Sequence, residues 1–457
     1  MITGIAQWRR GDEDFCDKVV GPLYNKLPVH RSPHLLVAPR DEDEVVRAIK
    51  AARQAGHKVA VRSGGHSWIG SSVRDQGMLI DMGAFDQVVI NAAARTARVG
   101  AAVRNDHFGR LLAKEGLAFP IGHCGGPAMG GYLLSGGLGL NWGLWQPACF
   151  SVRSIRVVTA AGELVVANES TNSELLWMAR GAGPGFPGVI TEFELDLKDR
   201  PADVRVSSWY FPLDALDDVT RWVRDASAEL PANVELAVTT IGPDRPMLPP
   251  GSGFPLHLVG VSALAFVDSE TEAKKALSPL SSGPRVAALM KNDLEPIPFE
   301  ALHLGADATH PEGQRVLGDT FWTDRNVHEA LPPLSTLVTA APAGKSFVVA
   351  IMPGHGARSS GVPQGAGAYS MDERTLVLAY AIWDDAAADA PNQKWMTEVV
   401  HPLELASTGH FLGEADLTRH PKRAARSFSK ASWERLSNLR LKWDPEAVFH
   451  GYPVAAV

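Results

Sequence analysis

Arg62-Ser63-Gly64-Gly65-His66-Ser67, the His66 loop, is the first of two glycine-rich stretches around which this sequence is organised. The second, the Cys124 loop, is Gly122-His123-Cys124-Gly125-Gly126-Pro127-Ala128-Met129-Gly130-Gly131. Each follows an apolar segment typical of a strand and places one potentially nucleophilic side chain among glycines. Glycine lets a backbone approach a ligand closely and adopt positive φ without steric cost. The two loops therefore predict a ligand held close to His66 and Cys124, near enough for a covalent bond.

Length and composition indicate an ordinary globular protein. The chain has 457 residues, 45% hydrophobic and 21% charged, which favours two or three domains. Its net charge of −7, without a dense run of Lys or Arg, argues against nucleic acid or an anionic membrane as the main partner. The three cysteines fit neither a zinc site nor a disulfide framework, which suggests free thiols. We see no secretory signal and no run of about 18 apolar residues, so we expect a cytoplasmic protein.

The region before the His66 loop alternates strand and helix. We predict a strand at His34–Pro39, a helix at Asp41–Ala55 with an acidic first turn, and a strand at Lys58–Arg62. This order is typical of α/β architecture. A third glycine cluster, Arg180–Gly188, leads into an alternating segment, Val189–Leu195, that predicts another strand.

Glycine clustering falls after Pro201, and we place domain boundaries near residues 200 and 415. The predicted parts are 1–200, 201–415 and 416–457. Strands are expected in the middle part at Glu235–Ile241 and Thr375–Trp383, and a helix near Leu213–Leu230.

Several common nucleotide and hydrolase motifs are absent. No Gly-x-Gly-x-x-Gly follows the first strand, and the P-loop pattern does not occur. The Gly-x-Ser-x-Gly nucleophile elbow is also missing from any strand–helix turn. The His66 loop does offer the successive N–H groups and hydroxyls of an anion nest, although a plain glycine turn has the same composition.

Taken in order, the motifs are more specific. Val-Arg-Ser-Gly-Gly-His-Ser is followed by Gly-x-Cys, by Ser-Gly-Gly-Leu-Gly, and then by Leu-Leu-Trp, Arg-Gly and Gly-Val-Ile-Thr. This order resembles the FAD-linked oxidases of the vanillyl-alcohol-oxidase superfamily, with a PCMH-type FAD-binding domain, and most resembles the berberine-bridge-enzyme-like branch. The resemblance covers residues 30–200 and, in outline, 410–457. It implies an α+β fold: an FAD-binding domain of two α/β subdomains, and a substrate-binding domain whose antiparallel sheet is covered by helices.

The resemblance also implies how the cofactor is held. His66 stands where the family attaches the flavin 8α-methyl group, and Cys124 where bicovalent members add a thioether at flavin C6. Tyr452 stands where the C-terminal tail passes the flavin. The remaining residues expected to contact FAD are Arg62, Ser63, Gly64, Gly65, Ser67, Gly122, Gly125, Gly126, Met129, Gly130, Ser135, Gly137, Gly188, Val189 and Ile190.

The catalytic base is less clearly marked. Where many relatives carry Tyr-x-Asn-Tyr, this chain has Phe411-Leu412-Gly413-Glu414. Of its six tyrosines, Tyr369, Tyr380 and Tyr452 fall in plausible regions. We favour Tyr452, Tyr369 and Glu414 as candidate bases. The histidines that remain as alternatives are His303, His310 and His355.

The activity implied by the resemblance is oxidation of a small molecule. An alcohol, sugar hemiacetal or secondary-metabolite carbon would give a hydride to flavin N5, and dioxygen would reoxidise the flavin to give hydrogen peroxide. The position that often gates oxygen in relatives holds Pro127, which makes an FAD dehydrogenase with another acceptor the alternative. A non-catalytic flavin-binding protein is the second alternative. Substrate identity and oligomeric state stay open.

Overall fold

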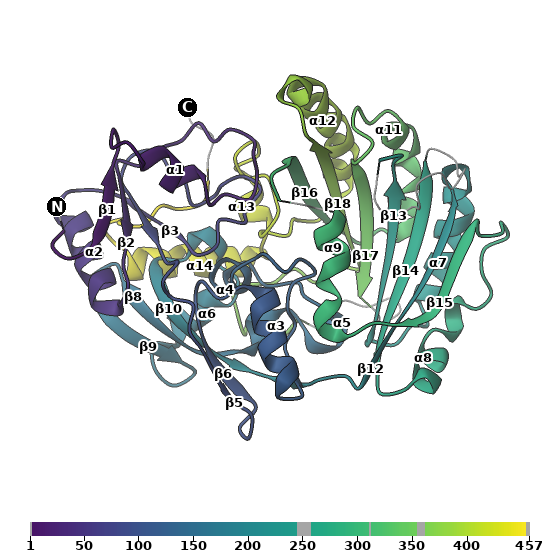
Figure 1. The fold of residues 1–457 in the computed structure, drawn as a ribbon, viewed down its shortest axis with the longest axis horizontal. Coiled ribbons are helices and arrows are strands. Elements are labelled where there is room, and N and C mark those ends of the chain that lie inside the picture. Colours follow the sequence, from purple (N-terminus) through teal and green to yellow (C-terminus); the bar gives the residue numbers. More distant parts are fainter. Residues whose placement is uncertain (1, 245–256, 310–311, 354–361, 454–457) are drawn as a thin grey trace.

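The strands nearest the N-terminus form a small mixed sheet. The computed structural model describes residues 2–244, 257–309, 312–353 and 362–453 (Figure 1). In this sheet two strands run parallel to the central β4, and the first strand pairs antiparallel at the edge. In sheet order the strands are β1 (Ala6–Arg9), β2 (Leu35–Ala38), β4 (Met78–Asp81) and β3 (Val59–Arg62). The predicted helix is α2 (Glu42–Gln54), where the side chain of Asp41 accepts a hydrogen bond from the Glu44 backbone N–H at the N-cap.

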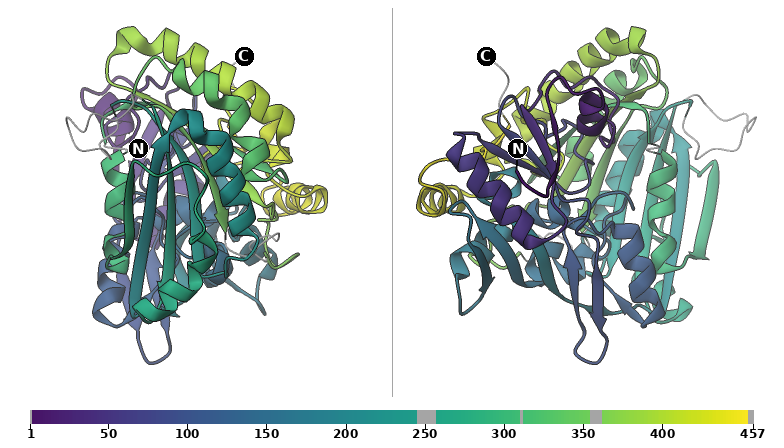
Figure 2. Two further views of the ribbon diagram at one scale, coloured as in Figure 1. Left: turned by 90° about the vertical axis from the view of Figure 1, so that its right-hand side faces the viewer. Right: turned by 60° about the vertical axis from the view of Figure 1, so that its left-hand side comes forward.

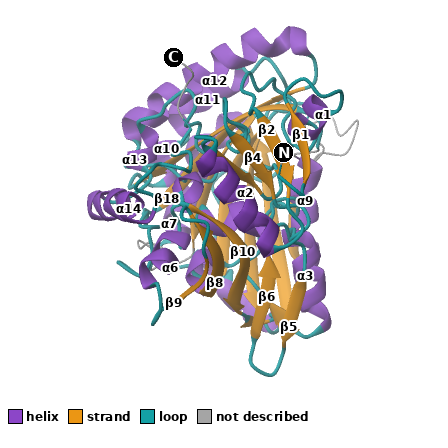
Figure 3. Ribbon diagram, turned by 90° about the vertical axis from the view of Figure 1, so that its left-hand side faces the viewer, coloured by secondary structure: helices purple, strands orange, loops and turns teal. Residues whose placement is uncertain are grey.

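A second, antiparallel sheet completes the N-terminal part of the chain. It carries the predicted strand after the third glycine cluster at its centre, between strands from before and after the Cys124 loop (Figure 3). In sheet order the strands are β5 (Val88–Asn91), β6 (Thr96–Gly100), β10 (Gly188–Asp196), β8 (Val152–Thr159) and β9 (Leu164–Asn168). The helices packed around it include α3 (Asn105–Lys114), α4 (Met129–Leu134), α5 (Trp142–Trp145) and α6 (Ser173–Ala179).

The middle of the chain builds a seven-stranded sheet in which every described pairing is antiparallel. In sheet order the strands are β15 (Met290–Pro296), β12 (Asp203–Pro212), β14 (Leu258–Val267), β13 (Val234–Ile241), β17 (Phe347–Pro353), β18 (Thr375–Trp383) and β16 (Arg315–Thr323). The α+β fold with an antiparallel sheet covered by helices is thus confirmed.

The two faces of this sheet have different partners. Because side chains alternate along a strand, Val377 and Ala379 of β18 face the covering helices, whereas Leu378 and Tyr380 face the N-terminal part of the chain. The covering helices are α7 (Leu216–Ser227), α8 (Glu270–Ala276), α10 (Val327–Ala330), α11 (Ser335–Thr339) and α12 (Asp389–Ala406), the last of them yellow-green at the top of both views in Figure 2. A further short helix, α9 (His303–Thr309), lies on the other side, between this sheet and α3 (Figure 1).

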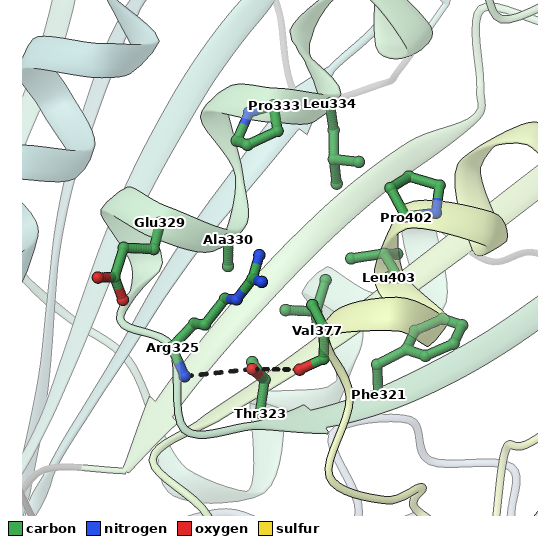
Figure 4. A pocket seen from close by; sticks show the side chains of 11 residues that line it. Phe321, Thr323, Arg325, Glu329, Ala330, Pro333, Leu334, Val377, Pro402 and Leu403 are labelled. Atoms are coloured by element: carbon green, nitrogen blue, oxygen red, sulfur yellow. Dashed lines mark hydrogen bonds between the residues drawn. The ribbon is translucent and has the colours of Figure 1, made fainter.

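A pocket opens on the helix-covered face, between α12 and the turn before α11 (Figure 4). Phe321 and Val377 come from the sheet, and Leu334 and Leu403 from the helical layer. The Arg325 backbone N–H donates to Thr323 Oγ1 at 3.1 Å. Since it lies on the helix side of the sheet, this pocket is separate from the two glycine loops.

The end of the chain returns to the N-terminal part. Helix α14 (Lys430–Trp443) lies against α6, where Lys442 Nζ is 2.6 Å from Glu174 Oε2 (Figure 1). Beyond it, the Val59 N–H donates to the Val448 carbonyl at 2.7 Å, and the His450 N–H donates to the Val59 carbonyl at 2.9 Å. The last described residues therefore lie along β3, the strand that leads into the His66 loop.

No helix in the ranges that the structure describes is long and apolar enough to cross a membrane.

Candidate active site

The two glycine loops pack directly against each other. A Cβ added to Gly64 would lie 2.7 Å from Ala128 Cβ, and one added to Gly126 would lie 2.6 Å from His66 Nε2. Gly130 likewise faces the Ser63 hydroxyl too closely for any side chain. The glycines are therefore required by close backbone approach, and the structure brings His66 and the Cys124 loop together.

The His66 loop presents unused backbone donors. Gly65 has φ +71°, and its carbonyl accepts a hydrogen bond from the Tyr24 N–H at 3.0 Å. The N–H groups of Ser63, Gly64, Gly65 and Ser67 donate to no acceptor within the described part of the chain. Consecutive free N–H groups around a positive-φ glycine form a concave site for an anion.

Arg62 supports this loop from behind. Its guanidinium is buried and bonds to the Asp81 carboxylate, while Nη2 donates to the Lys18 carbonyl at 2.8 Å. The side chain is thus occupied by the protein, although the sequence placed Arg62 among the cofactor contacts.

Asn105 fixes the shape of the Cys124 loop. This fully buried side chain accepts a hydrogen bond from the Gly122 N–H at 3.0 Å and donates to the Pro127 carbonyl at 2.7 Å. On the other flank, the Gly125 N–H donates to Asp307 Oδ1 of α9 at 3.1 Å. Burial raises the pKa of the half-buried Cys124 thiol, and the carboxyl groups of Glu414 and Asp307 raise it further.

The other predicted cofactor residues lie behind the loops. Met129 is fully buried at the start of α4, and Ser135 ends that helix. Gly137 has φ +70° and abuts Ala148. Gly188, Val189 and Ile190 begin β10, where both apolar side chains are buried in the core.

Glu414 is the candidate base that the structure places beside these loops. Its Oε2 accepts hydrogen bonds from the Tyr380 hydroxyl and, at 3.4 Å, from Trp68 Nε1. In the sheet Tyr380 pairs with Gly318, whose missing side chain leaves room for Trp68 and Tyr380 to pack over the strand. Trp68 follows His66 by two residues, so the carboxyl group is joined to the His66 loop.

The pKa shifts in this cluster point to Glu414 as its proton acceptor. Burial raises the pKa of Glu414 above the ordinary carboxyl range, although the hydrogen bonds from Tyr380 and Trp68 oppose the shift. Burial and the Glu414 carboxylate raise the pKa of Tyr380 well above its usual value. Tyr380 therefore stays protonated and donates, while Glu414 exchanges its proton at a higher pH than an exposed glutamate.

The other two candidate bases lie in different surroundings. The Tyr452 hydroxyl donates to the Ala182 carbonyl at 2.8 Å, and its ring packs on Trp433 of α14. Tyr369 is buried, and among the described residues its hydroxyl has no hydrogen-bond partner. Burial raises the pKa of both tyrosines.

Of the three histidines considered, His303 is buried in α9 against Gly125, and His310 and His355 lie outside the described residues.

Sequence reasoning missed a second polar pair in the same region. His123 Nε2 lies 3.0 Å from Glu235 Oε2, and Glu235 is only 5% exposed on β13. A glutamate that alternates with Val234 and Leu236 in a buried strand was the available signal, because buried carboxylates are rare unless they are paired.

Comparison with known proteins shows what this chain is similar to. Residues 33–168 match the FAD binding domain family. The FAD-linked oxidoreductase ptmO of Penicillium ochrochloron is 26% identical over 442 residues, which cover 96% of this chain and 94% of that protein.

Solved structures share the fold. 6-Hydroxy-D-nicotine oxidase of Arthrobacter nicotinovorans superposes with a TM-score of 0.84 at 20% identity, covering 98% of this chain and 97% of that one. The BBE-like 1 protein of Physcomitrella patens gives 0.83 at 18% identity, covering 99% and 98%. Dehydrogenases occur among the matches too, because wild-type Phl p 4.0202, with a TM-score of 0.82 at 17% identity, is a glucose dehydrogenase.

The fold and the FAD-binding region define the chain as an FAD-linked oxidoreductase. Residues 33–168 thus match an FAD binding domain, and the whole chain shares its fold with a berberine-bridge-enzyme-like protein, in line with the resemblance of its motif order.

The residues present fit FAD. The free N–H groups of the His66 loop suit a pyrophosphate, and the side-chain-free backbone around Gly126 lets a flat ring system approach. Tyr24, whose ring centroid is 4.2 Å from that of His66, adds an aromatic surface.

We expect Gly126→Ala to reduce the amount of FAD that purified protein retains. The new Cβ would clash with the His66 ring, and overpacking of this kind costs about 1–3 kcal/mol. Gly131→Ala is the matched control, since a Cβ there meets nothing within 4 Å. Visible flavin absorption per protein, measured for both variants, is the readout, and equal retention would show that the contact between the loops is not needed.

Proposed function

We propose that this oxidoreductase is an oxidase that removes a hydride from an alcohol, sugar hemiacetal or secondary-metabolite carbon while Glu414 accepts the substrate's O–H or N–H proton. FAD supplies the two-electron acceptor, and its reoxidation by dioxygen gives hydrogen peroxide. A small-molecule substrate and dioxygen are thus the proposed reactants.

The hydrogen-bonded group Tyr380–Glu414–Trp68 is the observation that carries the proposal. It joins the sheet face of the substrate half to the loop that bears His66. A general base needs to be near the site and have a pKa closer to neutrality than an ordinary carboxyl group. Burial gives Glu414 that shift, and the two donors fix the direction of its carboxylate.

His66 and Cys124 would hold FAD covalently, through a histidyl bond and a thioether. Both residues lie near Tyr24, whose ring packs on His66 and whose pKa is raised chiefly by burial. Two attachments from two loops in contact would prevent the cofactor from leaving and would fix its orientation toward Glu414.

An FAD dehydrogenase with another electron acceptor is the second candidate, and Pro127 favours it. This residue takes the place of the Val or Leu that often gates oxygen in relatives, and Asn105 holds its carbonyl rigidly from two donors.

We expect the acid-precipitated wild-type protein to remain yellow. His66→Ala and Cys124→Ala should each retain some covalent flavin, because the other attachment survives, and only the double variant should release it. The measurement is flavin absorption of the washed, denatured protein. An unaltered spectrum in Cys124→Ala would disprove the thioether, and colourless wild-type protein would disprove both attachments.

For a substrate found by screening, Glu414→Gln should lower kcat by about 10²–10⁴-fold, the usual contribution of a general base. In the wild type, kcat/KM should rise with pH as Glu414 loses its proton, at a pH above the ordinary glutamate value of about 4.3. Tyr380→Phe removes a hydrogen bond that lowers this pKa, so the rise should move to higher pH.

Glu434→Gln, an exposed change on α14, is the control for charge alone. A Glu414→Gln variant with the wild-type pH profile would exclude Glu414 as the base.

The electron acceptor is tested by counting peroxide. An oxidase should release one hydrogen peroxide for each substrate oxidised in air, whereas a dehydrogenase should turn over only when an artificial acceptor is added. If substrate is consumed with an added dye but no peroxide forms in air, the dehydrogenase is correct. Flavin bleaching by light without turnover of any tested substrate would favour the non-catalytic flavin-binding protein.

A further inference from the structure

The His123–Glu235 pair joins the Cys124 loop to the substrate half of the protein. Glu235 lies on β13, at a position that alternates with helix-facing residues, so its side chain points toward the N-terminal part. One carboxylate oxygen is 3.0 Å from His123 Nε2. The other accepts the backbone N–H of Asn141, at the start of α5. A single buried carboxylate thus contacts two separate segments of the FAD-binding half.

The His123 imidazole has two acceptors. Nε2 faces Glu235, and the Leu138 carbonyl accepts a hydrogen bond from the imidazole as well. An imidazole can donate from both nitrogens only when it is protonated. Burial opposes that charge, but the Glu235 carboxylate outweighs burial, and the pKa of His123 is raised. The pair is therefore a histidine–carboxylate contact between the two halves of the molecule that favours the protonated imidazole.

The pair has little capacity left to bind a substrate. His123 Nε2 and both Glu235 oxygens already have protein partners. The pair instead holds His123, and Cys124 is the residue that directly follows it in the chain. On the far side of that residue, Asp307 holds the Gly125 N–H. The thiol therefore sits between two backbone positions that carboxylates of the substrate half fix in place.

We propose that Glu235, acting through His123, is a positioning residue that sets the place of the Cys124 sulfur for attachment to FAD. The inference rests on the thioether proposed above. Joining the sulfur to the ring replaces the S–H bond and one ring C–H bond with a C–S bond. The two electrons and two protons released reduce one dioxygen to hydrogen peroxide. Only a sulfur held at the correct ring carbon can make this bond, whereas the histidyl bond forms from the other loop.

The test compares the two attachments in one protein. Holoprotein as expressed is denatured and digested, and mass spectrometry gives the flavin-bearing fraction of the His66 peptide and of the Cys124 peptide. Glu235→Gln should lower the Cys124 fraction several-fold and leave the His66 fraction near the wild-type value. Glu235→Asp, which keeps the charge, should restore part of the loss. Glu229→Gln, an exposed carboxylate of the same domain, is the control and should change neither fraction.

A double variant tests whether the two residues act together. If Glu235 works through His123, Glu235→Gln combined with His123→Ala should lose no more of the Cys124 fraction than the worse single variant. Equal loss of both attachments would indicate general unfolding of the interface and overturn the positioning role. If Glu235→Gln does not fold, His123→Ala decides in its place, because a wild-type Cys124 fraction in that variant would refute the positioning role.

The outcomes separate this inference from the proposed function. A wild-type Cys124 peptide without flavin means that the thioether itself is absent. A wild-type peptide with flavin, matched by an equally loaded Glu235→Gln peptide, means that the thioether is correct and the role of Glu235 is wrong.

Discussion

Close packing of two glycine loops, in which a glycine of each loop lies against a side chain of the other, is the constraint on which the rest of the site depends. The His66 ring reaches the Cys124 loop only because Gly126 has no side chain, and Gly64 is equally close to Ala128. This approach brings the end of β3 and the start of α4 together, although more than 60 residues separate them in the sequence. Within the described part of the chain it also leaves the N–H groups of Ser63, Gly64, Gly65 and Ser67 without acceptors, and so available for a ligand. A larger residue at any of these positions would separate the loops and their two reactive side chains at once.

Strand periodicity divides the seven-stranded sheet into a structural face and a functional face. On β18, Val377 and Ala379 pack under the helices, whereas Tyr380 faces the N-terminal half. On β13 the same alternation turns Glu235 away from the helix layer. Polar groups on an otherwise apolar, buried face cost free energy unless they are paired, and each of these is paired with a group that belongs to the site.

The sequence was informative wherever a function depends on a short motif. The two loops and their reactive residues follow from local patterns, and the resemblance carried by the motif order indicated FAD and the α+β fold. Partners far apart in sequence could not be predicted in this way: Tyr380 lies 34 residues from Glu414, and His123 lies 112 from Glu235.

Two strands that the sequence did not predict, β17 and β15, have weak local signals. Strand β17 is a continuous apolar run whose periodicity fits helix or strand equally well. Strand β15 lies at the edge of its sheet and is largely polar. Arg62 carries a motif signal, but its side chain serves the loop from behind, because Asp81 and two carbonyl groups lie within its reach. The pattern therefore located the loop without revealing what each of its side chains contacts.

Two carboxyl groups near Cys124, those of Glu414 and Asp307, affect both the thiol and its surroundings. Burial raises the pKa of the thiol, Glu414 and Asp307 raise it further, and the thiolate, which is the reactive form, is thereby disfavoured. Glu414 is also the proposed proton acceptor, to which the Tyr380 hydroxyl donates, and Asp307 holds the Gly125 backbone N–H in place. Both come from segments outside the N-terminal part, so this environment exists only when the two halves of the molecule are packed together. Before the two halves dock, His66 and Cys124 would be present without Glu414 beside them. Only the assembled protein brings the two attachment residues and the proposed base together.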